Sequence, residues 1–349
     1  MDSNMERAYW ECPKSAPPKD FLHVISAVVN CLSLVLNLGL LILLSLLAGK
    51  ARLFLVHLRA LTASAAFYSF IEICNRLIPY QNFPTDPNLG AILCYVWMSN
   101  YLSLTSYTFG TLILNFIVGN RAIQIACKYQ YSFSTSLVAD LAYLGGMGLV
   151  SLVFVLPQAF ILQWDGKYCR CRDTNLVHGH LVSLYAEVFI RFGLAVILST
   201  IILSISCYKI IYWVRNTPAE QLSDTWNSFA FASTTREQME AFSRPQGWMT
   251  ASICTLPLSA NFIVVSILEA GHEFVCAVGF CISMPYSPFA RVAHFLIDLQ
   301  LFLLPIIITI YIPALRDLLA RVCHRLFSSC RRQFKTVLPN SWTPAIFKR

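Results

Sequence analysis

Long apolar runs alternate with short polar connections along most of the chain. Seven of these runs reach the roughly 20 residues that a helix needs to cross the hydrocarbon core of a bilayer. A helix satisfies its own backbone hydrogen bonds, which lipid cannot do. The pattern therefore predicts an all-α protein with seven membrane spans at residues 22–48, 55–78, 91–119, 137–163, 182–214, 248–270 and 292–315.

The pattern changes after the seventh span, where apolar residues recur at helical spacing between basic ones. This alternation predicts a short amphipathic helix over residues 316–332 that lies on the inner leaflet, followed by a cytoplasmic tail at 333–349. Residues 1–21 are mostly polar, and the first apolar run is too long for the core of a cleavable signal peptide. We expect that run to remain as the first span.

Composition and charge agree with a membrane protein and indicate its orientation. The chain is 56% hydrophobic and only 13% charged, whereas soluble domains carry about 25% charged residues. The net charge of +8 is not gathered into one patch, so it argues against a nucleic-acid partner. Of the 26 Lys and Arg residues, 17 lie on the side of the membrane that holds the C-terminus, nine of them in or between the spans and eight after the last span. This bias predicts an N-terminus outside and a C-terminus in the cytoplasm.

Several short motifs stand at the ends of particular spans. Arg121, in Asn120-Arg121-Ala122, is the first charge after a long uncharged stretch at the end of span three. Span six contains Cys254-Thr255-Leu256-Pro257, in which Pro257 removes a backbone hydrogen bond and is expected to kink the helix. Span seven ends with Pro305 in Leu304-Pro305-Ile306-Ile307-Ile308. Each motif alone also fits an ordinary charged anchor or a common proline kink.

Taken together, these motifs, with Asn37 in span one and Tyr208 in span five, resemble those of rhodopsin-like (class A) G-protein-coupled receptors. The resemblance covers roughly residues 22–330 as a skeleton of spaced positions. It implies that a heterotrimeric G protein couples through the switch residues Asn120, Arg121, Tyr208, Pro257 and Pro305. The chain departs from the family pattern at several switch positions, namely Ala65, Asn120, Ala122, Thr255, Leu304 and Ile308. The missing acidic residue at Ala65 argues against modulation by sodium.

The resemblance also implies a disulfide between Cys94, before span three, and either Cys169 or Cys171 in the loop after span four. The sequence leaves that choice open. Cys12 could take the remaining cysteine, and Cys276 with Cys281 could close a small loop. Cys323 and Cys330, flanked by basic residues, are either palmitoylation sites or plain thiols. A zinc site at His178, His180 or His272 is disfavoured, and we expect no metal and no cofactor.

Ionisable residues within spans usually face the bundle or a watery cavity. Glu72 with Arg76 and Glu187 with Arg191 are spaced i, i+4 and predict two ion pairs. Asp298 has no such local partner, so it is either a ligand-binding group or a hydrogen-bonded structural one. The predicted outer pocket contains Glu72, Ser103, Tyr107, Arg191, Thr255, Ser259, His294 and Asp298.

The resemblance implies a receptor for an unidentified ligand, and the charged outer faces suggest a peptide or a small polar molecule. By family alignment Ser103 replaces the cation-binding Asp of amine receptors, and Asp298 replaces the retinal-binding Lys of opsins. We expect no enzyme activity, because no catalytic motif is recognisable. Two alternatives remain. One is a transporter or channel with a polar pathway near Glu72, Arg191 and Asp298, and the other is a receptor-like protein that does not signal.

Overall fold

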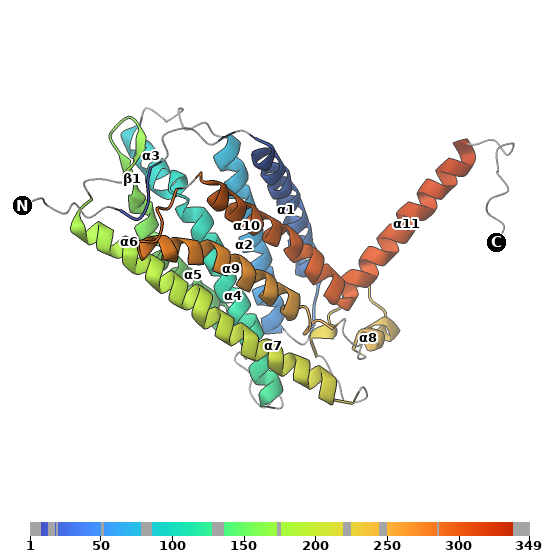
Figure 1. Cartoon of the computed structure of the whole chain (residues 1–349). Coiled ribbons are helices and arrows are strands. Elements are labelled where there is room, and N and C mark those ends of the chain that lie inside the picture. The colour runs from blue at the N-terminus through green and yellow to red at the C-terminus, as the bar shows by residue number, and fades with distance from the viewer. Residues whose placement is uncertain are drawn as a thin grey trace, which may run out of the picture.

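The computed structural model describes residues 8–12, 18, 20–49, 52–77, 86–127, 136–172, 176–218, 225–243, 250–284 and 286–337. Seven of its helical segments are long and apolar enough to cross a membrane, and they pack side by side as one bundle (Figure 1). The predicted seven-helix bundle is therefore confirmed. The segments are α1 (Phe21–Leu46), α2 (Arg52–Leu77), α4 (Tyr101–Ala126), α5 (Leu137–Val155) with its 3₁₀ extension η2 (Leu156–Ile161), α6 (His178–Arg191) through α7 (Ser199–Asn216), α9 (Thr255–Ala277) and α10 (Pro288–Tyr311).

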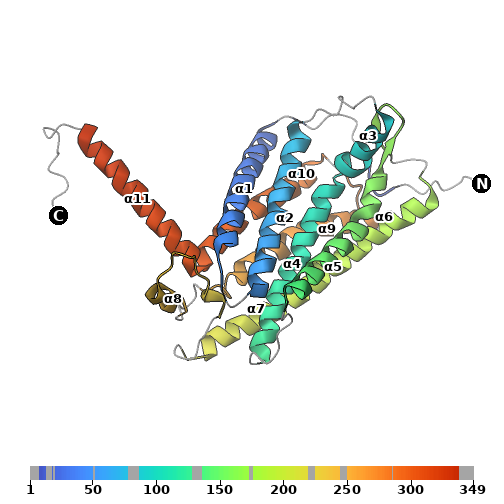
Figure 2. The ribbon, with the colours of Figure 1, turned by 180° about the vertical axis from the view of Figure 1, so that it is seen from behind.

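The two ends of the bundle differ in what covers them. One end carries three disulfides, a short hairpin of β1 (Leu162–Trp164) and β2 (Cys169–Cys171), and the N-terminal segment 8–12. We call it the disulfide end. The opposite end holds Arg121, near the last turn of α4, and the short helix η5 (Thr225–Asn227). Helix α8 (Arg236–Ser243) also lies at this end (Figure 2). We call this the Arg121 end.

The outward face of the bundle is apolar. Large hydrophobic side chains such as Val35, Leu149 and Ile205 are more than half exposed. The buried residues, in contrast, include many serines, asparagines and charged groups. Water would not solvate such a continuous apolar surface, whereas lipid does. The arrangement is that of a multi-pass membrane protein.

Two spans begin later in the chain than the sequence predicted. Span three is divided, because Asn100 adopts a left-handed conformation (φ 60°) that ends the preceding turns. The short helix α3 (Pro87–Ile92) and the π-helix η1 (Leu93–Met98) come before that break, and α4 follows it. Span six begins at Thr255 instead of at residue 248, and residues 250–254 form turns.

Pro257 does not kink span six as predicted. It occupies the third position of α9, where a missing N–H breaks no intrahelical hydrogen bond. The carbonyl of Ile253, four residues earlier, accepts from Leu256 N at 3.0 Å. Pro257 therefore helps to start the helix, and the predicted swing of a kinked helix has no basis at this residue.

Charged side chains bind both ends of α1. Asp20 is its N-cap, accepting from His23 N at 3.1 Å, and it also pairs with Arg291 of α10. The Arg291 guanidinium, and then the His23 amide, hold the pKa of Asp20 below its ordinary value. At the other end, Arg59 of α2 donates to the carbonyls of Leu44 and Leu47, each at 2.9 Å. These contacts satisfy carbonyls that the end of a helix leaves open.

A further helix, α11 (Pro313–Val337), follows span seven and points away from the bundle (Figures 1 and 2). It starts after Ile312, whose backbone is extended because the next residue is a proline. Leu319, Leu326 and Phe327 are exposed along it. The helix is longer than the predicted 316–332, and its position on a membrane surface remains a prediction.

Candidate functional site

A buried ionic cluster lies at the disulfide end between α1, α2, α4 and α10. Arg76 contacts Asp298 at 3.2 Å and Glu72 at 3.9 Å, so the predicted i, i+4 pair is confirmed. Ser103 donates to Glu72 Oε1 at 2.8 Å, and Ser26 donates to Asp298. We call these five residues the Asp298 cluster. Asp298 has no i, i+4 partner among the described residues, as expected, but it is buried and paired with an arginine from another helix, which the sequence did not predict.

A second cluster, which we call the Arg191 cluster, joins α6 to α9. The guanidinium of Arg191 lies 3.1 Å from Glu187 and 2.8 Å from Glu269, and it also pairs with Glu273. The Glu187 pair was predicted by its spacing and is confirmed. Gln158 donates to the other oxygen of Glu187 at 2.7 Å. One arginine thus faces three carboxylates. The ion pairs of this cluster join α6 to the disulfide end of α9.

The N-terminal segment 8–12 covers the Arg191 cluster. Tyr9 and Trp10 are buried against α6, in a hydrophobic cluster with Leu181, Leu184 and Val188. Trp10 Nε1 donates to the Arg172 carbonyl at 3.0 Å, and its backbone pairs with Ser283 in a parallel bridge. Burial and then the charge of Glu187 raise the pKa of Tyr9 well above its ordinary value, so its hydroxyl stays protonated. The segment closes this end of the bundle with the chain's own residues.

The three disulfides fix the covering of this end. Cys94 pairs with Cys169, which settles the choice that the sequence left open, and Cys12 pairs with Cys171. One strand, β2, therefore ties the N-terminal segment and the start of span three together. Cys276 pairs with Cys281 and closes a short loop after α9, as predicted.

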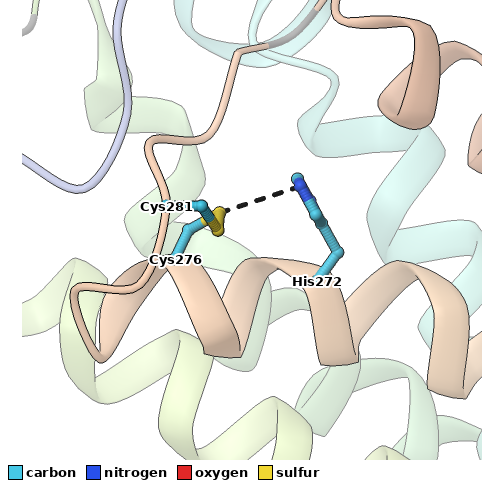
Figure 3. A group of neighbouring side chains, drawn as sticks. All are labelled: His272, Cys276 and Cys281. Carbon is cyan, nitrogen blue, oxygen red and sulfur yellow. Dashed lines mark hydrogen bonds between the residues drawn. A yellow bond between two sulfur atoms is a disulfide. The ribbon is translucent and has the colours of Figure 1, made fainter.

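The best candidate for a metal among the described residues is His272 with Cys276 and Cys281, shown in Figure 3. His272 Nε2 lies 3.7 Å from Cys276 Sγ. The two sulfurs are bonded to each other, whereas a metal binds cysteine as a free thiolate. The group is therefore a disulfide with a neighbouring histidine, and it gives no support to a zinc site.

The remaining predicted pocket residues do not gather in one place. Tyr107 is buried in mid-bundle, with its hydroxyl 3.4 Å from both Ser266 Oγ and Gln300 Oε1. A cavity of about 10 Å³ beside it has room for about one water molecule and is lined in part by Ser64 and Ser106. His294 is exposed, although it lies only one turn from Asp298.

Thr255 and Ser259 belong to the opposite end of the bundle, which corrects their assignment to the outer pocket. Thr255 is the first residue of α9 and donates to the Ser252 carbonyl at 2.7 Å. Helix α9 rises about 1.5 Å per residue toward the disulfide end, so both residues lie within its first turns. The prediction was wrong because it started span six at residue 248, whereas α9 begins at Thr255.

Arg121 is completely buried at its end of the bundle. Its Nε donates to Ser252 Oγ at 2.8 Å, and Nη1 lies 3.5 Å from Gln124 Oε1. Its guanidinium also lies over two tryptophan rings, 5.1 Å from the centre of Trp213 and 4.8 Å from that of Trp226. Neither aromatic contact was anticipated, since Trp213 is in α7 and Trp226 is in the connection to span six.

The other predicted switch residues divide into buried and exposed ones. Asn120 is buried beside Arg121, whereas Tyr208 is 63% exposed on the outer face of α7 and does not point into the bundle. Pro305 lies inside α10 and leaves the Leu301 carbonyl without its helical donor. Asn37 of α1 supplies the missing hydrogen bond, donating from Nδ2 at 3.1 Å. The Asn37 and Pro305 motifs are thus joined physically.

The proposed lipidation sites lie on α11. Cys323 is exposed and not in a disulfide. The side chain of Cys330 lies outside the described residues. Lipidation of Cys323 remains a prediction.

The fold and these contacts define a seven-helix integral membrane protein whose two ends carry different polar sites. No protein-family model matches the chain, and no curated protein matches it.

Proposed function

We propose that the protein is a divergent rhodopsin-like receptor that transmits ligand binding at the disulfide end to a heterotrimeric G protein at the Arg121 end. The observation that carries the proposal is the contact between Arg121 and the segment that precedes span six. Arg121 Nε donates to Ser252 Oγ, and Ser252 lies three residues before the first residue of α9. A shift of α9 would therefore change what Arg121 contacts.

The Arg191 cluster provides a route from the other end to the same helix. Glu269 and Glu273 are on α9, and both are held by Arg191 of α6. A ligand that binds Arg191 or these carboxylates would weaken the ion pairs between α6 and α9. Binding shifts a conformational equilibrium only through such a difference in contacts between two states. Because α6 and α9 both present charged groups to this cluster, a peptide or a small polar ligand is favoured.

The orientation follows from the distribution of charge. Disulfides are stable on the extracellular side, where the surroundings are oxidising. The basic residues concentrate at the Arg121 end and after it, as expected for the cytoplasmic side. We therefore assign the disulfide end to the outside of the plasma membrane and the Arg121 end to the cytoplasm.

The test is basal G-protein activation in cells that express the wild type, Arg121→Ala or Arg215→Ala at equal surface levels, read across all G-protein classes. Arg215 is an exposed arginine at the end of α7 and serves as the matched control. We expect a basal signal that Arg121→Ala changes by about tenfold, because the charged hydrogen bond to Ser252 is lost, and that Arg215→Ala leaves unchanged. A basal signal that is indifferent to Arg121→Ala would contradict the assigned role of this residue.

A transporter is the second candidate, because intramembrane charges often mark a substrate path. The Asp298 cluster is the observation in its favour, since it buries two carboxylates and one arginine between four helices. Uptake or efflux of charged solutes by proteoliposomes, abolished by Asp298→Asn, would support this candidate. A protein that shows neither flux nor G-protein activation, with surface expression established, would fit a receptor-like protein that does not signal.

A further inference from the structure

The connection between spans five and six sends a segment back into the bundle. We call residues 225–231 the inserted segment. Its residues Trp226 and Phe229 are 2% and 0% exposed, although connecting loops usually run over the surface. The ring of Trp226 stacks on Phe54 of α2 with 3.9 Å between centres and 7° between planes, and Phe229 stacks on the same ring at 5.8 Å.

Backbone and amide hydrogen bonds hold the inserted segment in one register. Ala48, after α1, and Ala230 exchange two backbone hydrogen bonds of 3.0 and 2.9 Å. The side chain of Asn227 accepts from Ala251 N at 2.8 Å. Gly49 leaves the room that Phe229 needs, because a Cβ at Gly49 would lie 2.6 Å from Phe229 Cδ1. The segment is thus bound by three separate parts of the bundle.

The inserted segment covers Arg121, the residue that a cytoplasmic partner would contact under the proposed function. Trp226 lies over the Arg121 guanidinium at 4.8 Å, and the apolar surface of Phe54 is covered by Trp226 and Phe229. A partner that contacts Arg121 from this end would have to remove Trp226 first. The partner could then bind the surface that the inserted segment had covered. This surface consists of the Arg121 guanidinium, the Phe54 ring and the backbone edge at Ala48.

We propose that the inserted segment is a self-docked inhibitor that competes with the G protein for the surface formed by Phe54, Arg121 and the Ala48 edge. Its inhibitory role rests on the proposed function, whereas its docking does not. The surface fits a partner segment that carries an aromatic or large apolar side chain and can form backbone hydrogen bonds. Release of Trp226 would give up an aromatic stack and a cation–π contact, which together oppose partner binding.

Docking is tested first, by disulfide trapping in native membranes. Hydrogen-bonded antiparallel neighbours are close enough for a disulfide, so Ala48→Cys with Ala230→Cys is the test pair. The control pair is Ala48→Cys with Met239→Cys, since Met239 is exposed on α8 in the same connection. We expect mild oxidation to cross-link the test pair and not the control pair, as read by mass spectrometry of the linked peptides. Equal cross-linking of both pairs, or of neither, would overturn the docking.

Inhibition is tested next, by guanine nucleotide exchange on purified G proteins of each class. We expect Trp226→Ala to raise basal exchange about tenfold above the wild type, because a stack and a cation–π contact are lost, and Met239→Ala to have no effect. The cross-linked Ala48→Cys/Ala230→Cys protein should fall below the wild type and recover on mild reduction. This second measurement keeps the proposal testable if Trp226→Ala fails to fold.

The outcomes separate the two proposals. If the wild type is active and neither Trp226→Ala nor cross-linking changes its exchange activity, the inhibitory role is wrong and the receptor assignment stands. If the test pair cross-links but no protein activates any G protein, the receptor assignment and the inhibitory role that depends on it both fail. The docking of residues 225–231 would then stand alone.

Discussion

At the scale of single residues, buried polar groups replace hydrogen bonds that the helices lack. Pro305 cannot donate to the Leu301 carbonyl, and Asn37 from α1 does so at 3.1 Å. Asn37 also binds Ser33 of its own helix, and Ser33 accepts from Ser69 of α2 at 2.9 Å. The carbonyl left open by Pro305 is therefore part of a hydrogen-bond network that links three helices. Satisfying each backbone group is especially important where no water is near.

This explanation predicts an energetic coupling between Asn37 and Pro305. Asn37→Ala should lower the free energy of unfolding by about 1–3 kcal/mol, since a buried carbonyl loses its donor. In a Pro305→Ala background the new N–H can bind the Leu301 carbonyl, so the same change should cost less. The measurement is a double-mutant cycle of thermal unfolding in detergent.

Asn115→Ala is the matched control for this cycle, because Asn115 of α4 donates to the Thr111 carbonyl one turn away and to Ser199 of α7, both outside α1 and α10. Its cost should be the same with proline or alanine at position 305. An Asn37→Ala cost that is equally indifferent to position 305 would refute the link between the two residues.

At the scale of elements, the sequence predicts most where the cause is local. The seven spans follow from hydropathy, and the pairs Glu72–Arg76 and Glu187–Arg191 follow from one turn of helix. Contacts between helices depend on how each helix is rotated, which no local pattern contains. For this reason the sequence did not reveal that Arg76 reaches Asp298.

The start of an element also decides which site a residue belongs to. A single left-handed residue, Asn100, divides span three. The late start of α9 moves Thr255 and Ser259 to the Arg121 end. Neither feature changes hydropathy, so an average over some 20 residues cannot detect it. Hydropathy also does not predict that the inserted segment is buried, because Trp226 lies in a polar connection.

The disulfide end offers a prediction about one covering element, the N-terminal segment. Cys12 and Cys171 are 159 residues apart, whereas Cys276 and Cys281 are only five apart. Because a cross-link that closes a longer loop restricts the unfolded chain more, Cys12→Ser should cost roughly 4–5 kcal/mol and Cys276→Ser roughly 2 kcal/mol. Thermal unfolding of the two variants in detergent gives the comparison.

A substitution that keeps this disulfide separates cross-linking from packing. Trp10→Ala retains the Cys12–Cys171 bond but loses burial against α6 and the hydrogen bond to Arg172. Its melting temperature should also fall, and reduction should lower it further, because the Cys12–Cys171 disulfide is still present. A Cys12→Ser protein as stable as the wild type would show that the segment is held without its disulfide.

At the scale of the whole molecule, an apolar outer surface fixes the bundle in lipid but does not choose its direction. Val35, Leu149 and Ile205 face outward on different helices, and none of them distinguishes one leaflet from the other. Charge provides the asymmetry. Basic residues from Arg316 to Arg349 follow the last span, and the disulfides lie at the opposite end.

These two asymmetries predict the same orientation, because moving many cations across the membrane is unfavourable and disulfides form outside the cytosol. An epitope placed before Met1 should bind antibody on intact cells, whereas one placed after Arg349 should bind only after permeabilisation. Replacing the eight Lys and Arg residues from Arg316 onward by Gln should raise the fraction of inverted molecules, and replacing Arg170 and Arg172 should not. Staining of the C-terminal epitope on intact wild-type cells would reverse the assignment of both ends, and with it the roles given to Arg191 and Arg121.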